Sequence, residues 1–120
     1  MTIYFSGAYI DSNLALNVYQ FFESKYTFIA DYDVEIYHTD LTDDNVKGWQ
    51  ERNGDEFLIH IDTNLDEGEY IKTIFHELVH CMQDIIGLND TTLRECEAYE
   101  LEQLYHDQFI TTEASKVSPK

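Results

Sequence analysis

Residues 66–87 carry the pattern that most constrains the fold of this chain. Apolar side chains recur there at steps of three and four residues, which is the repeat of one face of an α-helix. Asp66, followed three residues later by Glu69, is typical of a helix start, and Gly87 is typical of a helix end. A helix with such a stripe needs a sheet or other helices to cover it. The stripe consists of Ile71, Ile74, Phe75, Leu78, Met82, Ile85 and Ile86.

The segments before this helix predict a small sheet. Residues 33–38 alternate between apolar and polar side chains as a strand does, and two extended runs flank Asn53-Gly54, a strong hairpin signal. The second run, residues 56–62, should direct Phe57, Ile59 and Ile61 to one face of the sheet.

Two further helices complete the expected fold. One runs from a Ser12 cap to about Ser24, and the other from about Thr92 to Phe109. We therefore expect an α+β fold, in which a small antiparallel or mixed sheet packs against an N-terminal helix and two C-terminal helices. With 120 residues, of which 43% are hydrophobic, the chain fits a single domain over residues 1–110. Residues 111–120 are expected to form a flexible tail.

The charge balance limits the possible partners. Twenty-four acidic against seven basic residues give a formal charge of −17, which repels nucleic acids and anionic membranes and suits cations or basic peptides. No signal peptide or membrane span is expected, so the sequence predicts a cytoplasmic protein. Cys81 and Cys96 are expected to be buried free thiols on helices.

The polar side of the long helix carries a metal-binding pattern, His76-Glu77-Leu78-Val79-His80. Side chains four residues apart lie on one face of a helix, so the two imidazoles can bind one Zn²⁺. Glu77 lies beside them, where it can accept a proton from a water that the metal has acidified. Because His76 and His80 point away from the apolar stripe, the competing interpretation is an ordinary solvated polar face.

This pentapeptide resembles the H-E-x-x-H signature of the zincin metallopeptidases. The resemblance implies a zinc peptidase with a zincin-like fold, in which an edge strand before the helix, here residues 56–62, binds an extended peptide. Downstream, Gly87 is present but no histidine completes the metzincin pattern. Glu95-Cys96-Glu97-Ala98 instead resembles the E-x-x-A of the gluzincin branch. The short chain is similar to the minimal peptidases of phages and bacteria, which would act in the bacterial or host cytoplasm.

The third metal ligand has two candidates. The gluzincin resemblance favours Glu95, whereas Glu97 is the alternative because it falls among leucines, where a buried carboxylate needs a partner. Glu95 could instead close a capping box with Thr92.

Tyr99, Glu102 and His106 are expected on the same polar helical face as Glu95, where Tyr99 or His106 could stabilise an oxyanion. Tyr105 is expected in the core. Gln83 and Asp84 either orient an imidazole or lie exposed near the end of the preceding helix.

The sequence thus predicts a zinc-dependent metallopeptidase with His76, His80 and Glu95 as ligands and Glu77 as the catalytic base. Its substrate would be a peptide or protein, and the acidic charge would suit a basic one. An alternative is a catalytically inactive acidic protein on the same scaffold that sequesters a basic partner. A zinc hydrolase that acts on a non-peptide bond would use the same ligands. The oligomeric state has no signal in the sequence.

Overall fold

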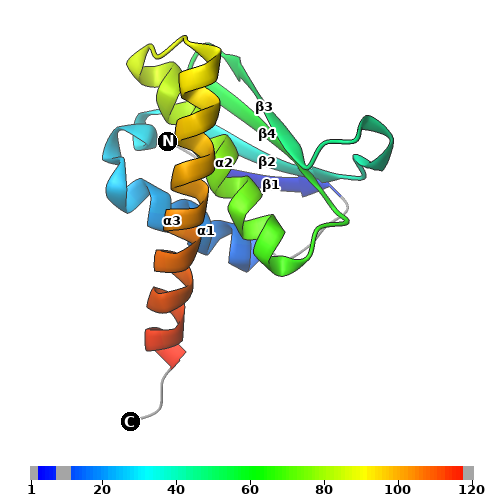
Figure 1. Cartoon of the computed structure of the whole chain (residues 1–120), viewed down its shortest axis with the longest axis vertical. Helices are drawn as coiled ribbons and strands as arrows, with labels where there is room; N and C mark the ends of the chain where they lie inside the picture. The colour runs from blue at the N-terminus through cyan, green and yellow to red at the C-terminus, as the bar shows by residue number, and fades with distance from the viewer. Residues whose placement is uncertain (1–2, 8–11, 118–120) are drawn as a thin grey trace.

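Three helices lie on one side of a four-stranded sheet (Figure 1). The computed structural model describes residues 3–7 and 12–117, with side chains over residues 13–114. This is the expected α+β fold with a mixed sheet and two C-terminal helices. Its elements are β1 (Ile3–Gly7), α1 (Ser12–Lys25), β2 (Asp33–Thr39), β3 (Gly48–Asn53), β4 (Glu56–Asp62), α2 (Glu67–Ile86) and α3 (Thr91–Val117), with 3-10 turns at Thr27–Asp31 and Thr42–Asp44.

The strands are arranged in the order β1-β2-β4-β3. The first three run parallel, and β3 pairs antiparallel with β4 at the edge of the sheet. The expectation that residues 56–62 form the edge strand is therefore wrong. The chain turns back through Gly54 and Asp55, so that β3 covers the outer side of β4. β1 was not expected, because its pairing with β2 joins segments about 30 residues apart that carry no local signal.

The sheet buries one face against the helices. As predicted, Phe57, Ile59 and Ile61 of β4 are buried in the core, together with Val34 and Ile36 of β2. Side chains of the alternate positions lie on the other face, where they are partly or fully exposed over most of the strands.

α2 lies between the sheet and α3 (Figure 1). Both of its expected ends are confirmed: Asp66 Oδ1 accepts a hydrogen bond of 2.9 Å from the Glu69 N–H, and Gly87 adopts a left-handed φ of 81°. The apolar stripe is buried from Ile71 to Met82, whereas Ile86 is exposed at the end of the helix. Because both β3 and α3 pack against α2, this helix also buries polar residues. These are Thr73, Glu77, His80 and Gln83.

α3 differs from the expected helix at both ends. It begins at Thr91, and its cap is Asp90, whose Oδ1 accepts a hydrogen bond of 3.0 Å from the Leu93 N–H. It continues to Val117 rather than ending near Phe109, because no glycine or proline interrupts this stretch. Residues 111–117 are thus helical instead of belonging to a flexible tail, and residues 118–120 lie outside the described residues. Tyr105 is buried, as predicted.

The cysteines match the expectation in part. Both are free, and Cys81 is buried on α2, but Cys96 is exposed on α3. None of the helices in the described ranges combines the length and the apolar composition that a membrane span requires.

Candidate metal centre

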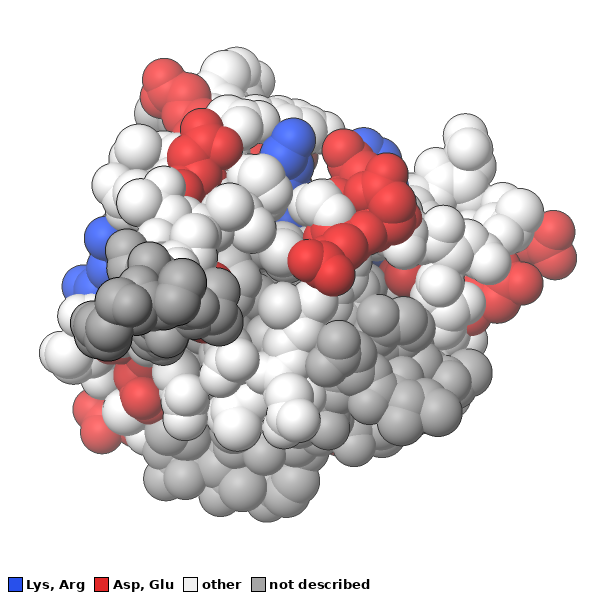
Figure 2. Space-filling view, turned by 90° about the horizontal axis from the view of Figure 1, so that it is seen from below, with Lys and Arg blue, Asp and Glu red and all other residues white. Residues whose placement is uncertain are grey.

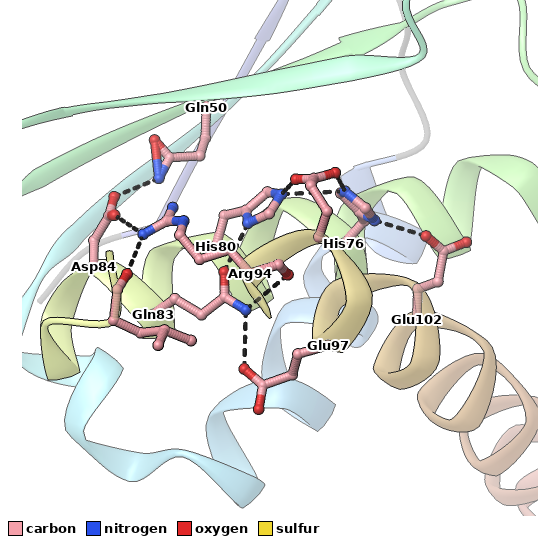
Figure 3. A network of polar contacts seen from close by, with 10 residues as sticks. Gln50, His76, His80, Gln83, Asp84, Arg94, Glu97 and Glu102 are labelled. Carbon is pink, nitrogen blue, oxygen red and sulfur yellow. Dashed lines mark hydrogen bonds and ion pairs between the residues drawn. The ribbon is translucent and has the colours of Figure 1, made fainter. Parts of the chain in front are cut away.

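Two histidines of α2 and a glutamate of α3 bring their ligand atoms together (Figure 3). The Nε2 atoms of His76 and His80 are 3.2 Å apart. Glu95 bridges them, with Oε2 2.7 Å from Nε2 of His80 and Oε1 3.4 Å from Nε2 of His76. Within residues 13–114, whose side chains are described, no other group of three His, Cys, Asp or Glu ligands is this close together.

The histidines are shielded from solvent. The side chains of His76 and His80 are only 11% and 10% exposed, because α3 packs over the face of α2 from which they project. The competing interpretation, a solvated polar face, is therefore wrong.

A hydrogen bond on the far side of each ring orients the histidines. Nδ1 of His76 donates to Oε1 of Glu102 over 2.7 Å, and Nδ1 of His80 donates to Oε1 of Gln83 over 2.8 Å. Carboxylate and amide oxygens can only accept, so each Nδ1 carries a hydrogen. In the neutral ring the other nitrogen, Nε2, then has a lone pair, and both lone pairs face Glu95.

With both rings neutral, the two Nε2 lone pairs and the Glu95 carboxylate converge with no hydrogen between them. These electron pairs repel one another unless a proton or a metal cation lies among them. Two nitrogens each about 2.05 Å from a tetrahedral ion would lie about 3.3 Å apart. The observed 3.2 Å between the Nε2 atoms of His76 and His80 fits this geometry. Two imidazoles and a carboxylate also form a common ligand set for divalent transition metals. The cluster of His76, His80 and Glu95 can therefore hold a metal ion.

The electrostatics of the cluster also favour positive charge. Burial lowers the pKa of His76, but the hydrogen bond to Glu102 and the negative charges of Glu77, Glu102 and Glu95 outweigh this effect, so the pKa is raised. These acidic groups stabilise a cation next to the ring, whether it is a proton or a metal ion.

Glu77 lies beside the cluster in a different environment. Its side chain is only 5% exposed. Burial raises the pKa of Glu77 to about 7; the charges of Glu95 and Glu102 add to the rise, and His76 opposes it. A carboxylate with such a pKa can both accept and release a proton near neutral pH.

A groove of about 760 Å³ opens onto the cluster. It runs between the edge strand β3 with its preceding loop on one side and α2 and α3 on the other. The lining residues from β3 and that loop are Asn45, Val46, Lys47, Gly48, Trp49 and Gln50. Those from the helices are Glu69, Thr73, His76, Glu77, His80, Asp84, Arg94, Glu95, Tyr99 and Glu102.

The two residues expected to stabilise an oxyanion occupy different places. Tyr99 lines the groove, with its ring centre 4.8 Å from that of His76. His106 is not among the lining residues; it pairs with Asp107 at 3.1 Å and lies near Gly68 in the first turn of α2. Tyr99 is therefore at the cluster, and His106 is not brought to it.

Glu95 and Glu97, the two candidates for the third ligand, have different partners. Glu97 accepts a hydrogen bond of 2.9 Å from Nε2 of Gln83 and does not join the cluster (Figure 3). The proposed capping box of Thr92 and Glu95 is wrong, because Asp90 caps the helix. Glu95 remains available to the histidines.

Some residues at the site were not assigned from the sequence. Glu102 lies seven residues after Glu95, two turns along the same helical face, and this spacing was the available signal for its contact with His76. Arg94 pairs with Asp84 over 2.6 Å, and Gln50 of β3 donates to the same carboxylate over 2.6 Å. No local pattern indicates this second network, because it joins three separate elements.

Comparisons with family models, curated proteins and solved structures gave no match for this chain. The function must therefore be inferred from the chemistry of the site.

Proposed function

We propose that the protein is a zinc-dependent peptidase with His76, His80 and Glu95 as metal ligands. The observation that carries this proposal is the convergence of these three electron-pair donors beside a buried glutamate, Glu77, in one groove. Two histidines, a glutamate and an open position form a known ligand set of catalytic zinc sites. The resemblance of the helix motif to the zincins supports the same assignment.

Glu77 is proposed as the general base. A Zn²⁺ ion held by the three ligands would polarise the substrate carbonyl and make a water acidic near neutral pH. Glu77 takes the proton of the attacking water and passes it to the nitrogen of the leaving amine. Burial raises its pKa in the metal-free protein, and a bound Zn²⁺ would lower it again toward the ionised form that accepts the proton. Tyr99 can donate a hydrogen bond from its hydroxyl to the developing oxyanion, and His106 has no role in this proposal.

The edge strand offers a binding site for an extended peptide. The Asp62 N–H donates to the Lys47 carbonyl over 2.8 Å. In an antiparallel pair, residues that bond to the neighbouring strand alternate with residues whose N–H and C=O point away from it, so this bond fixes which residues of β3 do which. The backbone groups of Gly48, Gln50 and Arg52 then face away from β4. Gly48 and Gln50 line the groove, so a substrate strand can pair with β3 there and present its peptide bond to the metal centre.

The charges of the groove favour a basic peptide. Its two cationic side chains are already paired, Lys47 with Glu69 and Arg94 with Asp84. The carboxylates of Glu77, Glu95 and Glu102 are not matched by any lysine or arginine among the lining residues. One Zn²⁺ would offset part of this negative charge, and basic residues of a substrate could offset the rest.

A binding protein on the same scaffold explains fewer of these features. Figure 2 shows acidic side chains in separate groups on one face of the molecule, with neutral surface between them. Sequestration of a basic partner would not require a buried glutamate next to three converging ligands. The proposed compartment remains the cytoplasm, and hydrolysis of a non-peptide bond would keep the same residue roles.

The test combines zinc content with cleavage of a peptide library that is rich in lysine and arginine. We expect one zinc per chain and measurable hydrolysis. Glu77→Gln should keep the zinc and lower turnover by about 10²- to 10⁴-fold. Glu100→Gln, the same change at an exposed position of α3 outside the groove, is the matched control. Salt-sensitive peptide binding that survives both Glu77→Gln and His76→Ala, with no cleavage, would support the binding protein instead.

A further inference from the structure

Gln83 is a fully buried polar residue that holds two parts of the metal centre at once. Its side chain lies three residues after His80 on α2, with no exposed surface. Its amide oxygen accepts from Nδ1 of His80 at 2.8 Å. Its amide nitrogen donates to the Arg94 carbonyl at 3.0 Å and to the Glu97 carboxylate at 2.9 Å (Figure 3).

The two bonds to α3 fix which way the amide faces. A backbone carbonyl and a carboxylate can only accept hydrogen bonds, so the NH₂ group of Gln83 must point toward Arg94 and Glu97. The amide oxygen must then point toward His80, which requires a hydrogen on Nδ1 of that ring. In the neutral ring this leaves the Nε2 lone pair directed at Glu95.

The same bonds hold the segment that carries Glu95. Arg94 and Glu97 lie on either side of this ligand in the first turns of α3, and both accept from Gln83. Arg94 is further tied to the end of α2 through its contacts with Asp84 and the Leu88 carbonyl. One buried amide therefore connects the ring of His80 to the backbone beside Glu95.

We infer that Gln83 is a positioning residue of the metal centre. It keeps the hydrogen of His80 on Nδ1, and it holds the first turns of α3 so that Glu95 stays opposite the two histidines. The inference rests on the proposed metal site but concerns a residue that touches neither metal nor substrate. It assigns different supports to the two rings, an amide anchored on α3 for His80 and the carboxylate of Glu102 for His76.

The first test is the affinity for Zn²⁺, measured by competition with a chromophoric chelator. Gln83→Met keeps a side chain of similar length but removes both hydrogen-bonding groups. We expect it to bind Zn²⁺ about 10- to 100-fold more weakly than wild type. Gln103→Met, the same change at an exposed position of α3, is the matched control and should bind as wild type does. Equal affinity of Gln83→Met and wild type within twofold would overturn the inference.

The second test exchanges the partners. In the double variant Gln83→Glu with Glu97→Gln, a carboxylate accepts from His80 while the new amide at position 97 donates to that carboxylate. This variant should bind Zn²⁺ more tightly than Gln83→Glu alone, in which two carboxylates face each other in a buried site. It should also bind more tightly than Gln83→Met. A double variant no tighter than Gln83→Met would show that position 83 acts only through packing, and would overturn the inference.

The third test needs no metal and separates this inference from the proposed function. In the zinc-free protein, NMR of ¹⁵N-labelled histidine should show an Nδ1–H of His80 that exchanges slowly with water. This signal should be lost in Gln83→Met, while circular dichroism confirms that the variant is folded. If wild type binds no Zn²⁺, the proposed function fails, but the protected signal would still support the contact from Gln83. Rapid exchange at Nδ1 in folded wild type would overturn it.

Discussion

The most informative single perturbation is Glu95→Gln, followed through the stabilisation of the fold by zinc. Glu95 contacts Nε2 of both histidines, at 2.7 and 3.4 Å, and it is the one proposed ligand that comes from α3. Removing its charge should weaken zinc binding by at least about a hundredfold. Loss of a residue that only orients a ligand costs up to about that much, and loss of a ligand itself should cost no less. Because a zinc ion would meet all three proposed ligands only when α2 and α3 are packed together, this loss should appear directly in the stability of the fold.

The expected size of the effect follows from mass action. At a free Zn²⁺ concentration about 100 times the wild-type dissociation constant, binding stabilises the folded state by about 2.7 kcal/mol. For a domain of 120 residues each kcal/mol shifts the melting temperature by about 4 °C, so wild type should gain about 10 °C. At the same zinc concentration, a hundredfold weaker variant gains only about 0.4 kcal/mol, or about 2 °C.

The assay is thermal unfolding followed by circular dichroism, with and without zinc, after treatment with a chelator. Glu100→Gln on the exposed side of α3 should keep the full shift, and Glu97→Gln should keep most of it, because an amide oxygen at position 97 can still accept from Gln83. A zinc shift in Glu95→Gln equal to that of wild type would refute Glu95 as a ligand. No shift in wild type would refute the metal site itself.

Three further predictions concern the scaffold. Gly48→Ala should destabilise the protein by about 1 to 3 kcal/mol in urea unfolding, because its Cβ would lie 2.6 Å from the His60 carbonyl oxygen and 2.8 Å from Cγ2 of Thr73. Gly68→Ala, which has ordinary contacts, is the control, and an equal loss there would contradict the steric argument. Asp90→Ala should cost about 1 kcal/mol through loss of the α3 cap, whereas Thr92→Ala should cost clearly less; the reverse order would restore Thr92 as the cap. Burial raises the pKa of Tyr19, and the charge of Glu23 adds to this rise. Burial also raises the pKa of Tyr105, and the hydrogen bond with Tyr26 adds to it. Stability from these phenols is present below their unfolded pKa of about 10 and is lost as pH rises further, so absorbance titration should show tyrosines that ionise late in the folded protein but not in denaturant.

Much of α2 was predictable because its signals are local. The apolar repeat, the Asp66 cap and the Gly87 stop all act within a few residues of chain, and each is found in the structure. The same applies to His76 and His80, which share a helical face whatever the rest of the chain does. The hairpin at Gly54 is a local feature too.

Contacts between distant segments were the ones that sequence reasoning missed or left open. The choice between Glu95 and Glu97 depended on the rotation of α3 against α2, since both glutamates lie on the same helix within one turn. Gln83 is a polar residue near the end of α2, where exposed side chains are common, and only the packing of α3 makes it fully buried. The edge strand is β3 and not the expected residues 56–62, because β3 pairs with the outer side of β4.

The sequence by itself determined the long helix, its caps and two candidate ligands one turn apart, because helix geometry is fixed by bonds between near neighbours. Only the tertiary structure decided that α3 covers this face, that Glu95 completes the cluster and that β3 borders the groove. Those arrangements follow from burying apolar surface between segments far apart in the chain, and their free energy depends on the whole set of contacts rather than on any short pattern.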